Sequence, residues 1–380
     1  MSSVEIVLDP RYAPPKTEAG AKSVTRLSEL LHIWLTERRP SLTSISRVSR
    51  SVRRFIDLNG DLALNDFTKD QMRYFLRELR RVPKMLPRHL LDKPMQAILR
   101  YSHDNPGLTT LAPTSIRAYL KDMQMIFNWA IAMDLCASNP ANNLRIVDHR
   151  DKSKLRVAFD MEDLKLIFER APLYAGCKAA HRRKHRGTLI IKDSLFWVPL
   201  VALFTGARLG EIAEATTNDF KKDGDIVYLD VQAPTGNRRL KTKAANRAIP
   251  IHPELIRMGF LRYLERQREL GHRKVFLEIQ GQRSIQDSRG WSQYWRHFQE
   301  SARITDRRKV FHSFRHTFKR ACRDCGIDEE VHDVLTGHRP YESGRRYGQG
   351  IAFKTLHRAI SKVHFEGLDL SHLYEGASAN

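Results

Sequence analysis

The sequence predicts a mainly helical protein of two domains, the second of which adds a small antiparallel β-sheet. Helical apolar spacing runs through residues 24–146 and returns from about 253 onward. Between these regions two sets of side chains alternate over 226–231, as in a strand, and 247–251 forms its hairpin partner across a basic turn at 234–246. A chain of 380 residues also exceeds one compact core. We therefore expect a helical N-terminal domain and an α+β C-terminal domain.

The N-terminal part begins with residues 1–23, whose prolines and lack of periodicity predict a flexible leader. The helical domain follows over 24–146 and ends near a Ser-Asn-Pro-Ala stop signal. Its expected elements are a helix with its apolar face over 27–34, a second over 45–56, a third after the N-cap candidate Thr68, a Pro-rich loop over 83–112 and a long helix over 114–133.

A polar and charged stretch at 147–157 predicts the linker between the domains. The second domain covers 158–366 and starts with a helix capped by Asp160. An apolar tail, 367–380, follows a short amphipathic helix. No internal repeat is visible in the sequence.

The composition indicates a polyanionic partner. Lys and Arg total 65 against 43 Asp and Glu, so the formal net charge is +22 and the isoelectric point is near 10.0. Nucleic acid is the first candidate, because each neutralised phosphate releases condensed counterions. The sequence contains no uninterrupted stretch of about 18 apolar residues, so it predicts no membrane-spanning helix. Four cysteines make no disulfide framework, and the N-terminus has no signal-peptide layout, so we expect a reducing, cytoplasmic location on DNA.

Three segments of the second domain combine cations with a candidate nucleophile. The first, over 205–211, reads Thr-Gly-Ala-Arg-Leu-Gly-Glu, where an apolar helix ends in glycines that flank one arginine. The second is the basic hairpin 240–250. The third is a series over 312–347 that contains His-Ser-Phe-Arg, then Leu-Thr-Gly-His, then Arg-Arg-Tyr.

These residue types suit transesterification at a phosphodiester. The forked guanidinium groups of Arg208 and Arg315 match the charge that develops on the non-bridging oxygens. Tyr347 offers a phenol nucleophile, which a cationic site helps to deprotonate. Lys241 on the hairpin can protonate the leaving 5′-oxygen, and His312 and His338 can move protons and hold phosphate oxygens. Because protein cations replace a metal, we expect no metal and no other cofactor.

The order of these residues resembles the tyrosine recombinase, or phage integrase, family. The family pattern is Arg, Lys, His-x-x-Arg, His or Trp, then Tyr, with an acidic residue three after the first Arg, here Glu211. Residues 312–317 match the family's HxLRH(S/T) box with Phe in place of Leu, and 335–338 match its LGH segment with Thr before the glycine. Tyr347 lies nine residues past that histidine, as the family spacing requires. The resemblance covers about 24–366.

The resemblance implies an N-terminal SAM-like core-binding domain and a C-terminal catalytic domain that close as a clamp around double-stranded DNA. It implies a site-specific recombinase that cuts and rejoins DNA through a 3′-phosphotyrosine, without metal or ATP. The implied roles are phosphate binding by Arg208 and Arg315, attack by Tyr347, protonation of the leaving group by Lys241, general acid–base catalysis by His312, a phosphate hydrogen bond from His338 and support of the arginines by Glu211.

The same resemblance implies partners beyond DNA. We expect self-association as a tetramer on two recombination sites, helped by accessory DNA-bending proteins. In this family C-terminal tails commonly dock on a neighbouring protomer, so we expect 367–380 to do the same; packing on its own core is the alternative.

Several assignments have competitors in the sequence. Lys243 lies two residues from Lys241 on the same hairpin and is the alternative general acid. Tyr341 is the rival nucleophile, although the spacing favours Tyr347. A topoisomerase that relaxes supercoils and a non-catalytic DNA-binding regulator are the competing functions. A metal-dependent nuclease is disfavoured, because the paired carboxylates that hold two metals are missing.

Basic residues outside the site are candidates for contacts to the DNA backbone. Those we select are Lys243, Arg247, Arg47, Arg50, Arg54, Arg182, Arg183 and Lys184. The last three lie in a segment with Cys177, His181 and His185, whose spacing suggests zinc. A fourth ligand is missing and the surroundings are cationic, so we favour a DNA-facing loop.

Overall fold

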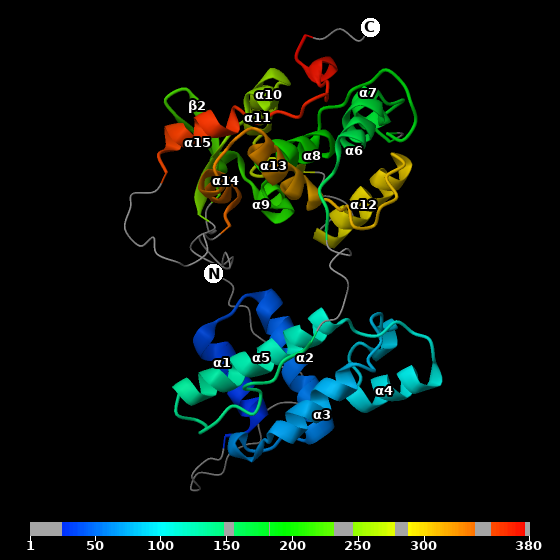
Figure 1. Ribbon diagram of the computed structural model, residues 1–380, viewed down its shortest axis with the longest axis vertical. Coiled ribbons are helices and arrows are strands. Elements are labelled where there is room, and N and C mark those ends of the chain that lie inside the picture. The colour runs from blue at the N-terminus through cyan, green and yellow to red at the C-terminus, as the bar shows by residue number, and fades with distance from the viewer. Residues whose placement is uncertain are drawn as a thin grey trace. The chain divides into compact units, whose positions relative to one another are not determined.

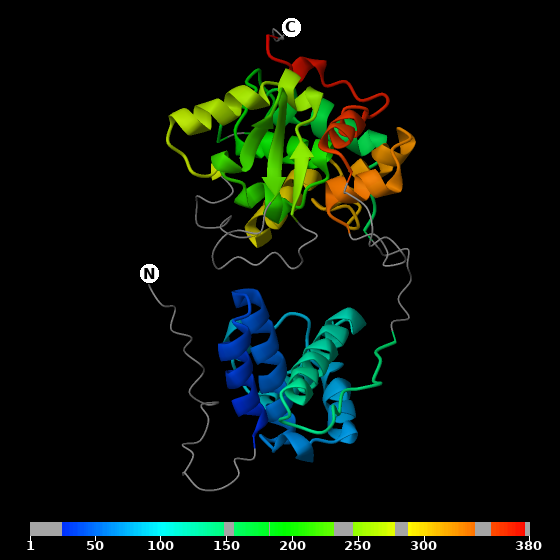
Figure 2. The same cartoon turned by 90° about the vertical axis from the view of Figure 1, so that its left-hand side faces the viewer.

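The structure is a computed structural model that describes residues 25–147, 156–181, 183–231, 246–277, 288–338 and 351–376. The chain divides into two compact units, with the boundary between Arg150 and Asp151, and each is described by itself (Figures 1 and 2). Several expectations concern residues outside the described ranges: the leader, Arg182, Lys241, Lys243, Tyr341 and Tyr347.

The described residues of the N-terminal unit form a helical bundle around an aromatic core. Its helices are α1 (Leu27–Arg38), α2 (Leu42–Asn59), α3 (Lys69–Leu79), α4 (Met95–Asp104) and α5 (Pro113–Ala132). Helix α5 packs against α1, α2 and α3 (Figure 1). The rings of Phe55 and Phe75 are fully buried, with centroids 5.2 Å apart in an edge-to-face arrangement.

The N-cap predicted at Thr68 is confirmed. The backbone N–H of Gln71 donates to Thr68 Oγ1 (3.3 Å), and the Gln71 side chain accepts from the Thr68 backbone N–H (2.8 Å). The loop predicted over 83–112 is wrong, because this stretch contains a 3₁₀ turn, Arg88–Leu90, and α4. Proline was misleading here: Pro94 stands at the N-cap of α4, where a missing N–H costs nothing, rather than inside a loop.

The arginines of α2 do not share one environment. Arg50 is exposed, and Arg47 is paired with the buried carboxylate of Asp122. Arg54 is buried instead: its Nη1 donates to the Tyr119 hydroxyl (2.6 Å) and its guanidinium lies 5.5 Å from the Tyr119 ring centroid. Burial lowers the pKa of Arg54. The contact to DNA expected of Arg54 is therefore corrected, since its guanidinium is occupied inside the bundle.

The C-terminal unit is organised around α8 (Ser194–Thr205), a helix buried at every residue except the partly buried Leu195, against which α13 (Ser313–Asp324) packs. The other helices are α6 (Met161–Lys165), which continues as a π-helical turn (Leu166–Arg170), α7 (Pro172–Ala175), α9 (Leu209–Glu214), α10 (Pro253–Arg257), α11 (Phe260–Glu269), α12 (Ser288–Ser301), α14 (Glu329–Thr336) and α15 (Phe353–Ile360). Asp160 caps α6 as predicted, accepting from the Asp163 backbone N–H (3.0 Å).

A three-stranded antiparallel sheet completes this unit, in the order β1 (Phe220–Asp223), β2 (Ile226–Val231) and β3 (Arg247–Pro250). The pairing predicted for β2 and β3 is confirmed, with Leu229 opposite Ile249. Strand β1 was missed because Phe220 is its one buried residue and the charged residues after it show no alternation. The fold class, mainly helical with a small antiparallel sheet, is confirmed. Within the described ranges no helix has the length and apolarity to cross a bilayer.

The tail packs on its own unit as far as the structure describes it. Leu370 and Leu373 are buried in the core of the C-terminal unit. Lys192 Nζ donates to the Leu373 carbonyl (2.7 Å), and the Glu375 backbone N–H donates to the Arg257 carbonyl (3.0 Å). Through residue 376 the tail therefore packs on its own unit, as in the alternative, and docking on a neighbouring protomer stays a prediction.

Arg54→Met is expected to lower the Tm of the N-terminal unit, because the Tyr119 hydroxyl loses its partner. The loss should be about 1–3 kcal/mol, the usual cost of breaking a buried hydrogen bond to a charged group. Arg50→Met is the matched control on the same helix and should change the stability by less than about 0.5 kcal/mol. Calorimetry of the full chain measures both; equal Tm values for the two variants would contradict the buried placement of Arg54.

Candidate active site

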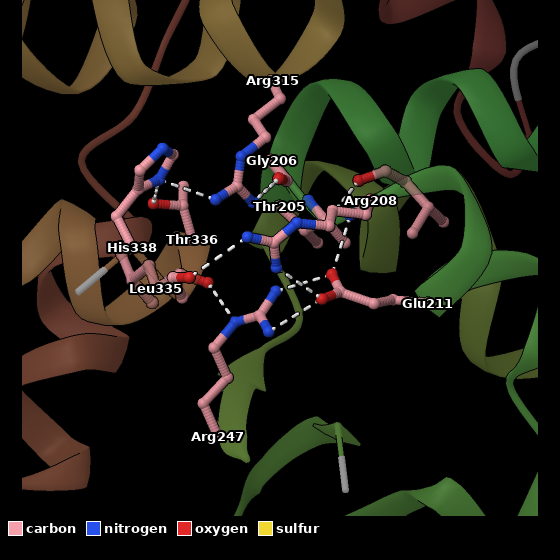
Figure 3. Close-up of polar contacts among 12 residues, drawn as sticks. Thr205, Gly206, Arg208, Glu211, Arg247, Arg315, Leu335, Thr336 and His338 are labelled. Atoms are coloured by element: carbon pink, nitrogen blue, oxygen red, sulfur yellow. Dashed lines mark hydrogen bonds and ion pairs between the residues drawn. The ribbon is translucent and has the colours of Figure 1, made fainter. Parts of the chain in front are cut away.

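Two helix ends that finish in glycine create the site. Helix α8 ends at Gly206 (φ 62°) and α14 ends at Gly337 (φ 65°), both in the left-handed conformation that glycine adopts without strain. Arg208 follows the first glycine as the N-cap of α9, and His338 follows the second. Arg315 lies in the first turn of α13 (Figure 3). Side chains far apart in the sequence therefore meet where α8, α13 and α14 converge.

Arg315 joins the two helix ends from beneath the surface. Its Nη1 donates to the Gly206 carbonyl (2.8 Å), and its Nη2 lies 2.7 Å from His338 Nδ1. The residue is 2% exposed. Burial, together with the positive charges of Arg208 and Arg247, lowers the pKa of Arg315 to about 9, so the group is still charged at neutral pH. A bound anion would relieve this crowding of like charges.

Arg208 is more open to solvent, with 41% of its side chain exposed. Its Nη1 donates to Glu211 Oε1 (2.9 Å), its backbone N–H donates to Glu211 Oε2 (2.8 Å), and its Nη2 donates to the Gly337 carbonyl (3.2 Å). The backbone bond to Glu211 caps the start of α9, and together with the ion pair it fixes the Arg208 side chain relative to the helix.

Glu211 and Arg247 lie below these arginines and are almost fully buried, with 7% and 4% of their side chains exposed. Arg247 donates through Nη2 to Glu211 Oε2 (2.7 Å) and through Nη1 to Glu211 Oε1 (3.1 Å). Burial alone would raise the pKa of Glu211, but the bonds and charges of Arg247 and Arg208 outweigh it and lower this pKa to about 2. The DNA contact expected of Arg247 is corrected, because its guanidinium is enclosed.

His338 is held in one tautomer. A guanidinium only donates hydrogen bonds, so Nδ1 of His338 must accept from Arg315, and the ring proton is then on Nε2. Partial burial and the positive charges of Arg315 and Lys319 lower the pKa of His338 to about 4, so the ring is neutral at physiological pH. His338 can therefore present one fixed N–H to an incoming oxygen.

His312 lies at the N-terminus of α13, three residues before Arg315. Its ring is exposed and meets the His316 ring edge to face at 5.2 Å between centroids. Partial desolvation, His316 and the nearby arginines lower the pKa of His312. A neutral imidazole at physiological pH can accept a proton, as a general base requires.

The structure thus brings together Arg208, Glu211, Arg315 and His338 through shared hydrogen bonds, with His312 on the same helix as Arg315 (Figure 3). Sequence reasoning missed the buried position of Arg247 and the ion pair of Lys319 with Asp333 (2.7 Å), whose carbonyl accepts from the His338 backbone N–H. No rule of sequence spacing identifies the pairs Arg247–Glu211 and Lys319–Asp333, because each joins two helices or a strand and a helix.

The basic segment around residues 177–186, which was predicted to face DNA, contains both paired and exposed cations. Arg183 is partly buried in an ion pair with Asp193, whereas Lys184 is exposed. Arg183 is therefore corrected from a DNA contact to an anchor of this loop. Cys177 is buried, and its thiol lies 3.2 Å from the Leu189 carbonyl, whereas His181 and His185 are exposed. Among the described residues no His, Cys, Asp and Glu side chains are grouped to hold a metal ion.

Gly206→Ala is expected to destabilise the C-terminal unit by about 1–3 kcal/mol, the usual cost of overpacking. A Cβ at this position would lie 2.6 Å from Cδ1 of the buried Phe318, and the φ of +62° disfavours any side chain. Gly210→Ala is the control inside α9, where a Cβ meets nothing within 4 Å; it should be neutral or stabilise by up to about 1 kcal/mol. Calorimetry distinguishes them, and equal Tm shifts would contradict this packing.

The lowered pKa of Glu211 makes a prediction for stability against pH. Because the folded pKa lies below the ordinary 4.5, the ionised carboxylate stabilises the fold fully above pH 4.5, and this contribution falls as the pH drops toward about 2. Glu211→Gln should therefore be less stable than the wild type at pH 7, by an amount on the order of 3 kcal/mol. The difference should shrink as unfolding is repeated down to pH 3; a constant difference would contradict the assigned interaction.

Residues 183–350 match the model of the phage integrase family. The integrase of the Tn1549 transposon, solved with a circular intermediate DNA, shares 15% identity with a TM-score of 0.54, over 83% of this chain and 92% of that one. A lambda integrase dimer bound to a core site shares 16% identity with a TM-score of 0.50, over 87% and 81%.

At these identities the structural matches show a shared fold, and no curated protein sequence matches the chain. The family match spans the segment that contains both site arginines, both site histidines and Tyr347. Over residues 183–350, within its C-terminal unit, the chain therefore matches the phage integrase family, and it shares the fold of two solved integrases.

Proposed function

We propose that this chain is a site-specific recombinase that cleaves and rejoins double-stranded DNA through a 3′-phosphotyrosine at Tyr347. The observation that supports it most is the joint fixation of Arg208, Arg315 and His338 around two glycine-ended helices. Two guanidinium forks and one N–H donor form a cradle for the oxygens of a phosphodiester. Such donors are worth most where negative charge increases in the transition state.

The reaction that fits this cradle exchanges one phosphoester for another. The Tyr347 phenol oxygen attacks the phosphorus, its proton passes to His312, and the bond from phosphorus to the 5′-oxygen breaks. Lys241, with Lys243 as the alternative, gives its proton to that oxygen. Rejoining reverses these steps with a 5′-hydroxyl as the nucleophile, so the phosphoester energy is kept and no ATP is consumed. The arginines supply the charge that a metal would otherwise provide.

Each supporting residue has a physical reason for its role. The lowered pKa of His312 keeps its imidazole neutral and ready to accept the phenol proton. His338 would hydrogen-bond a phosphate oxygen through Nε2. Glu211 is buried and would support Arg208 from below without touching DNA.

The partner that fits the net charge of +22 is double-stranded DNA. Arg47, Arg50 and Lys184 have exposed cationic side chains and are the described candidates for backbone contacts. We propose that the two units close as a clamp on the duplex. Joining two duplexes breaks four strands, and with one tyrosine per strand the assembly needs four protomers. The DNA complexes of the two matched integrases support this proposal.

Trapping of a covalent adduct tests the chemistry. The wild-type protein is incubated with fragmented DNA from the genome that encodes it, denatured, and examined for protein-linked DNA. We expect an adduct that is lost in Tyr347→Phe, because phenylalanine has no nucleophilic oxygen. Tyr341→Phe is the matched control and should still form the adduct. Sequencing of the attached DNA should return one recurrent site.

Other results would point to the competing functions. An adduct that survives Tyr347→Phe but not Tyr341→Phe would transfer the nucleophile to Tyr341. DNA binding without any adduct would favour the non-catalytic regulator. Adducts at unrelated sequences, together with relaxation of any supercoiled plasmid, would favour a topoisomerase.

A further inference from the structure

Arg247 occupies a central place in the site. Only 4% of the Arg247 side chain is exposed, and Nε, Nη1 and Nη2 of its guanidinium each bond to a protein group. Nη1 and Nη2 hold the two oxygens of Glu211, while Nε donates to the Leu335 carbonyl (2.8 Å) at the end of α14 (Figure 3). One side chain therefore bonds to α9, which carries Arg208, and to the helix end that precedes His338.

The contact with α14 is unusually close because of Gly337. A Cβ at Gly337 would lie 2.9 Å from Arg247 Nη1 and 3.1 Å from Cζ, so the guanidinium rests directly on the glycine backbone. The carbonyl of the same glycine accepts from Arg208 Nη2 (3.2 Å). Arg247 and Arg208 thus hold this turn from two sides, and His338 is the next residue.

Arg247 also determines how much of the positive charge of Arg208 is left uncompensated by Glu211 and can act on a ligand. Each oxygen of Glu211 accepts from both arginines: Oε1 from the two Nη1 atoms (2.9 and 3.1 Å), and Oε2 from the Arg208 backbone N–H (2.8 Å) and Arg247 Nη2 (2.7 Å). With Arg247 in place, the carboxylate is balanced by a buried cation. Without it, Glu211 would balance Arg208, and the cradle would lose positive charge toward the phosphate.

We propose that Arg247 is a positioning residue for DNA cleavage: it neutralises Glu211 and fixes the end of α14, so that Arg208 keeps its charge for the phosphate and His338 keeps its orientation. Because Arg247 begins β3, it also ties this cradle to the three-stranded sheet. The inference rests on the proposed recombinase function for its kinetic consequence, but its structural consequence is independent of catalysis.

The kinetic test uses Arg247→Lys and Arg247→Met on the recurrent DNA site found by adduct trapping. Lysine keeps the charge beside Glu211 but cannot also bond to Leu335, so it remains informative if the methionine variant does not fold. The rate of adduct formation is measured with protein in saturating excess and below the Tm of each variant. It should fall by about tenfold to about a hundredfold, because a small displacement of the reacting groups slows a reaction by such factors. The Kd for DNA and its salt dependence should stay within about twofold, because Arg247 makes no phosphate contact.

Arg268→Met is the matched control, since Arg268 Nη2 also donates to two carbonyls, those of Thr217 (3.1 Å) and Phe220 (2.9 Å), but at the base of the sheet. It should lower the Tm without slowing adduct formation. Wild-type rates in both Arg247 variants would overturn the proposal. Weaker DNA binding with a smaller salt slope would also overturn it, in favour of a direct phosphate contact.

A second measurement tests the positioning role of Arg247 even if the wild type forms no adduct. The absence of an adduct would count against the proposed function and not against this role. In full-length protein labelled with ¹⁵N-histidine, the His338 ring, assigned with His338→Gln, should show Nδ1 as acceptor and Nε2 as donor. Arg247→Lys should shift these ring nitrogens toward a mixture of tautomers, while Arg268→Met should leave them in place. Unchanged His338 signals in Arg247→Lys would overturn the positioning role.

Discussion

The site depends on one buried carboxylate that separates like charges. Arg208 and Arg247 would repel each other in a poorly solvated space, and Glu211 lies between them with bonds to both. Arg315 bonds instead to the Gly206 carbonyl and the His338 ring. The cluster retains an excess of positive charge that is fixed before any ligand arrives, which is the condition for strong electrostatic stabilisation of a transition state.

Much of the fold was predictable because its signals are local. The cap at Thr68, the cap at Asp160 and the pairing of β2 with β3 follow from side-chain types at fixed short spacings. What failed lacked such a signal. Strand β1 buries only Phe220, and α4 begins directly after a proline in a stretch that reads as a loop.

The candidate site shows the same division. Arg208, Arg315 and His338 were selected from motif order, and the structure brings them together. The burial of Arg54 and Arg247 could not be read from the sequence, because a cation looks alike on a surface and in a core until its partner is known. Those partners, Tyr119 and Glu211, lie 65 and 36 residues away along the chain.

The fixed tautomer of His338 has a consequence for which side chains this position can accept. A ring whose Nδ1 is bound to Arg315 and whose pKa is about 4 acts as a single N–H donor and does not exchange protons during a reaction at neutral pH. An indole supplies the same kind of donor and never titrates. A Trp at position 338 would therefore keep a single N–H donor, while Arg315 Nη2 would lose the acceptor that His338 Nδ1 supplies.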